Sequence, residues 1–425
     1  MSASDVPIFH FIFLTRTIPL ATISKHVDIP RRMTERIHQI PRLKYYTLAA
    51  FFVIGIVTLL LGQVLPLLSA RLDLSDAKAG TLFLAQFSGS ILGTFASTRI
   101  ARRYGFTLTV LIGLFLIIFG LPGINSDEFA YCWAAIFVYG SGLGVTIPSI
   151  NMLTIETTEH GRRSSAVNLI NFSWGVGAIC SQPFVAILSR GADNLAVVTI
   201  VLIVALVVLA VLFFSAARSI PRKAESDSEQ EPSLPRIWRR PASWLFVAFG
   251  FFVVSVEGGL GGWLTTYSEV LKSRDIYTIN LTVIYFAFFV LGRGIASIIS
   301  RHLSENHLIL FCSFTLLAGV VVLVSSESLA ILGAAIAGLG SSALFPTHMV
   351  RFAHVFGQSA MLQAAPVFIA GTCGAAAVST LVGLVSSAFG GLRYGIFVVL
   401  VSAVSIVILH FVIVAVFKGE PRPAA

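Results

Sequence analysis

Charged residues are scarce in this sequence. Asp, Glu, Lys and Arg make up 12% of its 425 residues, about half of the share usual in soluble globular domains. Apolar residues make up 56%. A soluble fold cannot bury that much apolar surface, so much of it must face lipid. The composition therefore excludes an ordinary soluble domain and indicates an integral membrane protein.

Cysteine is also rare, and several motifs are missing. The four cysteines lie inside apolar runs, without the spacing of metal ligands. We expect buried thiols, no metal site and no cofactor other than a coupled ion. No ATP-binding loop is found, which argues against ATP-driven transport by this chain alone. The basic residues lie in short loops between apolar runs, so their excess indicates membrane topology and not nucleic acid as a partner.

Twelve segments are long and apolar enough to cross a bilayer, which takes about 20 residues. They are residues 45–70, 79–101, 106–124, 129–153, 163–188, 195–217, 242–270, 277–300, 307–325, 328–350, 359–387 and 392–417. With both termini in the cytoplasm, all but seven of the 29 Lys and Arg residues fall on the cytoplasmic side, as the positive-inside rule requires. The seven are Arg71, Lys78, Arg190, Lys272, Arg274, Arg293 and Arg393.

A polar, proline-rich linker at 218–241 divides the spans into two sixes. We therefore predict an all-α integral membrane protein of two six-helix bundles, at 44–217 and 242–418. Residues 1–43 are expected to form a cytoplasmic extension, unless Met33 is the true start, and residues 419–425 a cytoplasmic tail. The most favoured host is a bacterial inner membrane, and the expected state is a monomer in the lipid bilayer.

The two halves repeat each other at an offset of about 198 residues. Gly140 and Gly142 align with Gly338 and Gly340, and Ile147-Pro148-Ser149 aligns with Phe345-Pro346-Thr347. Several matches at nearly one offset indicate a parallel duplication. Glycines at these places are typical of close helix packing.

Local motifs sharpen this organisation. The sequence Gly62-Gln63-Val64-Leu65-Pro66 and the run from Val256 to Tyr267 are similar to the first and seventh spans of the fucose–galactose–hexose branch of the major facilitator superfamily, and of the related sodium-dependent glucose transporters. The resemblance implies alternating access by two bundles and a sugar as solute. Two departures stand out. Arg102 replaces the Asp of the family's loop motif, and the first span lacks the acid of the proton-coupled fucose carriers, which leaves sodium coupling or uniport open.

Glu257 is the leading candidate for ion coupling. An acid inside a span costs about 2.5–3.5 kcal/mol on insertion scales, so it usually faces a water-filled path or a partner. Four of the next five residues are glycines; such a run can unwind, and its freed carbonyls could then help coordinate a cation beside the carboxylate. The open alternative is a structural hydrogen bond to a neighbouring helix.

Polar and aromatic side chains in the spans are candidates for solute binding. Asn168, Asn171 and Trp174 share one helix face, where amides suit sugar hydroxyls and a ring suits the apolar face of a sugar. The equally open alternative is packing between helices or, for aromatics, the interfacial belt. For His348, in the tenth span, two interpretations stay open: a contact to the solute or a switch by protonation, and a position near a loop without such a role. The full binding set is Gln63, Gln86, Asn151, Asn168, Asn171, Trp174 and Trp263.

Four charged residues near the cytoplasmic ends of spans are candidate gates: Arg102, Glu156, Arg293 and Arg301. Glu156 is expected to form a salt bridge with Arg162 or Arg163, and the long stem of Arg293 suits anchoring. The overall expectation is a secondary transporter of a small polar solute, a monosaccharide first, and not an enzyme. The alternatives are a drug or metabolite exporter, a membrane transferase built on Glu156, Glu159 and His160, and a sensor, for which no output domain is found.

Overall fold

The computed structural model describes residues 31–158, 163–189, 195–217, 237–274, 279–300, 302–357 and 363–418. Side chains are described from Leu43 onward within these ranges, except at 163–165, 216 and 217. The first half contains α1 (Arg31–Leu72), α2 (Asp76–Tyr104), α3 (Phe106–Gly120), η2 (Leu121–Asn125), α4 (Phe129–Thr157), α5 (Arg163–Leu188) and α6 (Leu195–Ala217). The second half contains η4 (Ile237–Arg239), η5 (Pro241–Ser243), α7 (Trp244–Ser273), α8 (Leu281–Ile299), α9 (Glu305–Ser325), η6 (Glu327–Leu329), α10 (Ala330–Ser341), α11 (Leu344–Phe356), α12 (Ala365–Phe389) and α13 (Leu392–Phe417).

Twelve helical segments of the described chain are long and apolar enough to cross a membrane, which confirms the predicted number of spans and the all-α class. The tenth span consists of two helices, α10 and α11, separated at Ser342 and Ala343. Pro346 is the third residue of α11, where its missing N–H costs little because the first turn of a helix has no partner for that group. Pro148, its counterpart in the fourth span, lies inside the continuous helix α4.

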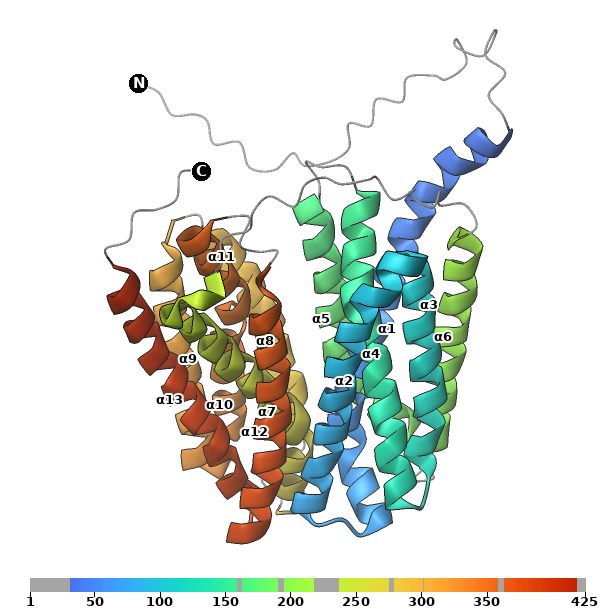
Figure 1. The fold of residues 1–425 in the computed structure, drawn as a ribbon. Helices are drawn as coiled ribbons and strands as arrows, with labels where there is room; N and C mark the ends of the chain where they lie inside the picture. The colour runs from blue at the N-terminus through green and yellow to red at the C-terminus, as the bar shows by residue number, and fades with distance from the viewer. Residues whose placement is uncertain are drawn as a thin grey trace, which may run out of the picture.

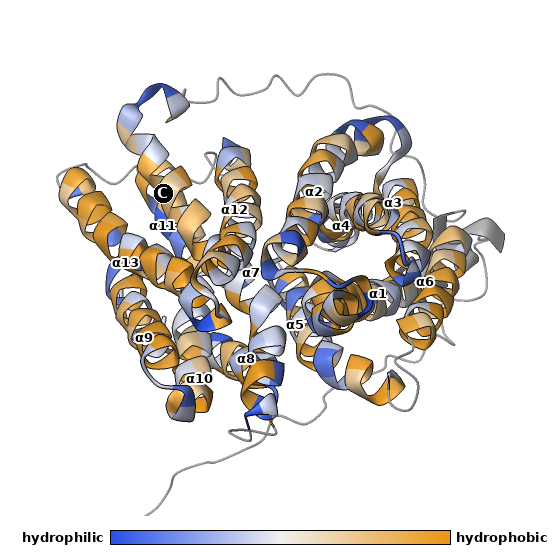
Figure 2. Cartoon of the chain, turned by 90° about the horizontal axis from the view of Figure 1, so that it is seen from below, coloured by the Kyte–Doolittle hydropathy of each residue, from blue (hydrophilic) through white to orange (hydrophobic). Residues whose placement is uncertain are grey.

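The helices form two groups, α1–α6 and α7–α13, which lie side by side (Figures 1 and 2). Apolar segments dominate the outer rim of both groups in Figure 2. We call the end of the molecule where α6 and α13 finish the linker face, and the end that carries the α1–α2 connection the opposite face. Odd-numbered spans run from the linker face to the opposite face, and even-numbered spans return.

The internal repeat is visible in the packing. A Cβ added at Gly140 of α4 would clash with the backbone of Gln86 on α2, and one added at Gly338 of α10 would clash with Tyr285 on α8. Gly142 likewise lies against Ile117 of α3. Its partner in the repeat, Gly340, lies against Leu316 of α9. The fourth span therefore packs on the second and third as the tenth packs on the eighth and ninth, which is the expected parallel duplication.

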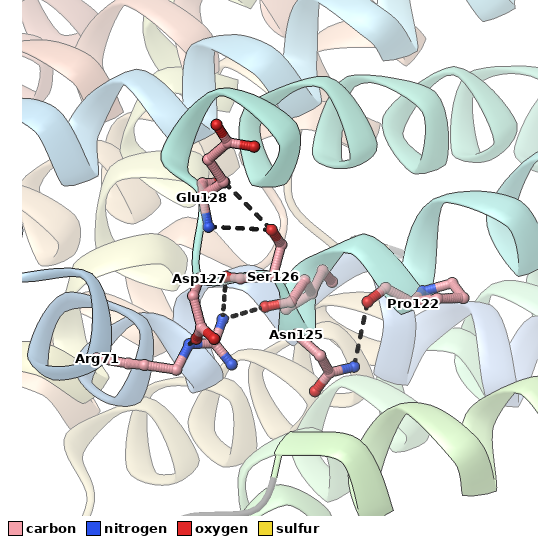
Figure 3. Close-up of polar contacts among 7 residues, drawn as sticks. Arg71, Pro122, Asn125, Ser126, Asp127 and Glu128 are labelled. Atoms are coloured by element: carbon pink, nitrogen blue, oxygen red, sulfur yellow. Dashed lines mark hydrogen bonds and ion pairs between the residues drawn. The ribbon is translucent and has the colours of Figure 1, made fainter.

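An arginine at the opposite face braces each half. Arg71, at the end of α1, donates to the carbonyl oxygens of Ile124 and Ser126 at 2.5 and 3.0 Å, and its Nε lies 3.6 Å from the Asp127 carboxylate (Figure 3). In the second half, Arg274 follows α7 and pairs with Glu327 at 2.8 Å. In both halves the end of the first span is thus tied to the connection between the third and fourth spans.

Candidate functional site

Three helix pairs carry the main contacts between the two halves: α1 with α7, α2 with α12, and α5 with α8. In the first of these pairs the backbones approach closely at Gly62 of α1, where an added Cβ would be 2.6 Å from the carbonyl oxygen of Gly261 and 2.9 Å from that of Gly262. Small residues allow such backbone approach in membranes. Gly62 and the α7 glycines therefore mark the junction of the two bundles.

On the opposite-face side of this junction, α2 of the first bundle and α12 of the second bundle are in direct contact. Ser386 donates to the Asp76 carboxylate, the Ala77 amide donates to Ser387 Oγ at 2.8 Å, and Thr380 donates to the Gly80 carbonyl oxygen at 3.2 Å. Trp263 packs against Phe83 of the other half, with ring centroids 5.7 Å apart. We call this set the opposite-face gate.

On the linker side of the junction, the bundles separate. Gly175 of α5 lies against Val290 of α8, where an added Cβ would be 3.1 Å from the valine methyl group. Asn168 lies seven residues, or two turns, closer to the linker face on the same side of α5, and it is exposed. Figure 1 shows the two groups diverging toward the end where the termini lie. The two bundles therefore lie apart toward the linker face and in contact at the opposite face, and we call the space between them on the linker side the opening.

Glu257 lies where this opening ends. It is one turn from Gly261 on α7, so it projects on the side that touches Leu59 of α1 and Phe286 of α8 at Gly261. Its residue surface is partly exposed, yet its Oε1 atom is buried without a hydrogen-bond partner in the described structure. A buried polar atom without a hydrogen-bond partner in the protein is uncommon in native structures, which singles out this carboxylate.

The glycine run that follows Glu257, which the sequence would allow to unwind, is helical in the structure. Helix α7 is continuous from Trp244 to Ser273. The glycines instead admit neighbours, because an added Cβ would meet Ala375 of α12 at Gly258 and Val399 of α13 at Gly259. Close packing keeps the helix regular, so its carbonyls remain in helical hydrogen bonds.

Arg293 does not extend to the linker face. Its Nε donates to the Ser342 carbonyl oxygen at 3.2 Å, in the break between α10 and α11. Its guanidinium carbon lies 4.4 Å from the centre of the Phe289 ring. It also interacts electrostatically with Glu257, although the described side chains form no ion pair there. Arg293 thus connects the acid of α7 with the broken tenth span.

On the first half, Thr58 is the meeting point of the polar groups. It precedes Gly62 by one turn of α1, which places it level with Glu257. Trp174 donates to its Oγ1 at 3.3 Å, and Gln86 donates to its carbonyl oxygen at 3.1 Å. Tyr139 donates to the other end of the Gln86 amide at 2.7 Å. Gln86 is therefore buried with both ends occupied, whereas Trp174 is partly exposed.

Asn151 and Asn171 form a pair between α4 and α5. Asn171 donates to Asn151 Oδ1 at 3.2 Å, and each amide also bonds a carbonyl of its own helix. Both are partly buried, and Asn168 is exposed one turn nearer the linker face. The structure thus brings three of the predicted amides to one side of the opening.

Gln63 and Trp263 lie inside the junction. Thr265 of α7 donates to Gln63 Oε1, Thr282 of α8 lies 2.8 Å from the same hydroxyl, and the Gln63 Nε2 atom is buried without a partner. Trp263 donates to the Ser379 carbonyl oxygen at 2.8 Å and is buried. In this conformation both residues join the bundles and do not face the opening.

The other candidate gates are at the linker face. Arg102 and Glu156 are exposed near the ends of α2 and α4. Arg301 and Arg162 fall outside the described residues, as do Glu159 and His160. The expected salt bridge of Glu156 and the roles of these residues stay predictions.

Several residues were missed by sequence reasoning. Thr58, Tyr139 and Thr265 are hydroxyl-bearing residues inside apolar helices, and Asp76 lies before residue 79, where the second span was predicted to begin. The signal for Thr58 was its place one turn from Gly62. Nothing in the sequence indicated that Trp174 and Gln86 would converge on it.

The sequence model of the Major Facilitator Superfamily matches residues 47–347. The glucose/mannose transporter GlcP of Bacillus subtilis is 22% identical over 355 residues, which cover 79% of this chain and 86% of GlcP.

Two solved structures share the fold at low identity. The E. coli fucose:proton symporter FucP superposes with a TM-score of 0.57 at 14% identity, covering 87% of this chain and 98% of FucP. An inward-facing, unoccupied bacterial homolog of the human lysosomal transporter Spinster gives a TM-score of 0.70 at 15% identity, covering 92% and 99%. At these identities the structures establish the fold alone.

Proposed function

Because the chain belongs to the Major Facilitator Superfamily, we propose that it carries a small polar solute across the membrane by alternating access, with a monosaccharide as the solute and Na⁺ or H⁺ as the coupled ion. Membership confirms the family resemblance drawn from the sequence and makes the chain a transporter and not an enzyme. The solute and the ion are the proposed part.

The observation that carries the proposal is the position of Glu257. The acid lies where the opening between the bundles ends, with one carboxylate oxygen buried and without a partner. A carboxylate there is stable when a proton or a cation neutralises it. Closing the bundles over a neutralised Glu257 costs less than closing them over a charged one, which couples the ion to the conformational change.

Polar and aromatic side chains of the first half support a sugar as the solute. Trp174, Asn171 and Asn168 offer a ring and amide groups on one side of α5. Amides both donate to and accept from hydroxyl groups, and a ring packs on the apolar face of a pyranose. The names of GlcP and FucP, a glucose/mannose transporter and a fucose:proton symporter, agree with this class.

The topology we propose has both termini and the linker face in the cytoplasm of a bacterial inner membrane, with the chain acting as a monomer. The charge distribution supports it, because Arg102, Arg103, Arg239 and Arg240 are exposed near the linker face. In that orientation the structure is open to the cytoplasm.

The test is uptake of labelled hexoses into proteoliposomes that contain the wild type or Glu257→Gln, with and without inward Na⁺ or H⁺ gradients. We expect gradient-driven accumulation by the wild type. The amide of Glu257→Gln cannot take up a proton or neutralise a cation, so we expect accumulation to be lost and sugar exchange to be retained.

Glu269→Gln is the matched control, because Glu269 lies on the same helix, is exposed, and pairs only with Lys272 at 3.6 Å among the described salt bridges. It should accumulate sugar like the wild type. Absence of hexose uptake under every gradient would refute the sugar proposal and favour an exporter of other solutes. Accumulation that survives Glu257→Gln would remove Glu257 from coupling.

A further inference from the structure

A buried arginine holds the linker-face end of the second half together. Arg351 of α11 and the two histidines next to it, His348 of α11 and His410 of α13, are each no more than 3% exposed. The Arg351 guanidinium lies 3.0 Å from His348 Nδ1 and 3.3 Å from His410 Nδ1. It also lies over the Phe249 ring of α7, 4.8 Å from its centre. We call Arg351, His348 and His410 the Arg351 cluster.

The chemistry of the cluster fixes the protonation of both histidines. A guanidinium has five donors and no acceptor, so each Nδ1 must accept and must carry no proton. His348 Nε2 lies 2.9 Å from the Phe246 carbonyl oxygen, which can only accept. His348 is therefore the neutral tautomer with its proton on Nε2. The Nδ1 atom of His410 likewise carries no proton, so this imidazole is also neutral, with its proton on Nε2. A proton added to either Nδ1 would replace an acceptor by a donor facing Arg351, and it would bring two cations together in a buried site.

The charges that face the cluster come from α9 and α11. Glu305 of α9 interacts electrostatically with Arg351, and it pairs with the exposed His354 of α11 at 3.0 Å. His307, also on α9, interacts with His410. From α7 the cluster is faced by Phe246 and Phe249, which carry no charge. No carboxylate lies within ion-pair distance of Arg351 among the described residues.

The cluster holds a short helix that is separated from the rest of its span. The break at Ser342 and Ala343 divides α11 from α10, so α11 is not fixed through a continuous helix. His348 ties α11 to the Phe246 carbonyl of α7, and Arg351 ties it to His410 of α13.

We propose that the Arg351 cluster is a proton-operated latch, which holds α11 against α7 and α13 while both imidazoles are neutral and releases it when one takes up a proton from the linker face. Release loosens the linker-face end of the second half. The inference stands on the contacts of the cluster and is independent of the solute and ion proposed above.

The test is hydrogen–deuterium exchange of the full-length protein in detergent at about pH 8 and about pH 5, between which histidine titrates. After correction for intrinsic exchange, we expect the amides of 344–356 to exchange at least about tenfold faster at the acidic pH, because a released helix exchanges by local opening. The amides of 330–341, across the break, serve as the internal reference and should change little.

The double variant His348→Asn/His410→Asn keeps an acceptor oxygen near each Nδ1 position and cannot be protonated there. It should show no acid-dependent exchange in 344–356, whereas His302→Asn, at an exposed histidine near the linker face, should behave like the wild type. Equal acid dependence in the double variant and the wild type would refute the latch. If the double variant does not fold, ¹⁵N spectra of the wild-type imidazoles decide, because protonated Nδ1 atoms in both histidines at about pH 8 would contradict it.

Discussion

Thr58 illustrates how one small side chain can position a larger one. Its Oγ1 donates to the Ile54 carbonyl oxygen at 2.6 Å and accepts from Trp174 at 3.3 Å, so the hydroxyl fixes the indole of α5 against α1. If Trp174 packs on the solute, the threonine sets the height and tilt of that ring without touching the solute itself.

We expect Thr58→Val to weaken solute binding by roughly fivefold, since leaving the partly buried Trp174 N–H without its partner costs about 1 kcal/mol. Valine has nearly the shape of threonine, so the fold should be retained. The measurement is the concentration of labelled solute that gives half-maximal exchange in proteoliposomes. Thr58→Ser, which keeps the hydroxyl, is the control. Equal losses in both variants would mean that the methyl group, and not the hydrogen bond, is needed.

At this scale the sequence located the unusual residues better than their partners. Glu257 was recognisable because an acid in a span is costly, and Asn171 with Trp174 because they share a helix face. Gln86 and Trp263 looked equivalent to them in the sequence. In the structure Gln86 is hydrogen-bonded to Tyr139 and to the carbonyl oxygen of Thr58. Trp263 is hydrogen-bonded to the carbonyl oxygen of Ser379. Helical periodicity indicates which face a side chain occupies, but it does not indicate which helix lies opposite.

Among the helices, α7 shows that a glycine-rich run can serve the close packing of helices and does not have to form an unwound segment. The sequence run suggested an unwound segment, yet every glycine of the run has a neighbour close enough to explain it, on α1, α2, α8, α12 or α13. Glycine weakens a helix because it loses more backbone freedom on folding than other residues, and close packing of neighbouring helices can offset that cost. The neighbours are distant in sequence, so the sequence could predict a special segment and not its conformation.

We expect Gly62→Ala to disfavour the conformation that is open to the linker face. The new methyl group would press on the Gly261 and Gly262 carbonyls, and overpacking costs about 1–3 kcal/mol, or at least about a fivefold change in the ratio of the two conformations. The readout is maleimide labelling of a cysteine placed at Asn168, in a variant without the native cysteines, which should become slower.

Gly294→Ala is the control, because an added Cβ at Gly294 has open space around it. It adds the same methyl group to a membrane helix and should leave labelling unchanged. A Gly62→Ala protein that labels as fast as the wild type would show that the α1–α7 contact adjusts without changing the balance between conformations.

At the scale of the whole molecule, closure at the opposite face combines the packing of α2 on α12 with a few polar contacts among the described residues. Asp76 and Ser386 belong to different halves, and their hydrogen bond exists only while α2 and α12 are together. The Asp76 carboxylate also lies at the start of α2, where a negative charge is favourable in either conformation. Its loss should therefore act on the equilibrium chiefly through Ser386.

We expect Asp76→Ala to shift the equilibrium toward opening at the opposite face by roughly thirtyfold, which corresponds to the loss of a charge-assisted hydrogen bond of about 2 kcal/mol. The measurement is the distance distribution between spin labels at Tyr131 and Phe389, which are exposed near this face in different halves. Glu269→Ala removes a carboxylate from the same face and should leave the distribution unchanged. A wild-type distribution in Asp76→Ala would exclude this bond as a determinant of closure.

The number of spans, the two bundles and their duplication were all predictable, because lipid exposure and the positive-inside rule act on every span. The conformation was not, since it depends on a small difference between two packings of the same surfaces. Residues such as Gly62 and Asp76 mark where the halves meet only after the helices are placed.

The approach of Gly62 to the α7 glycines has a mechanical consequence. If the bundles rock about this point, each straight helix acts as a lever, and displacement grows with distance from the fulcrum. Trp244, at the start of α7, lies 17 residues from Gly261, or about 25 Å at 1.5 Å per residue. A rotation of about ten degrees would then move that end by about 4 Å, whereas Glu257, one turn from the fulcrum, would move by about 1 Å. The acid would stay nearly stationary while the entrances on either side open and close.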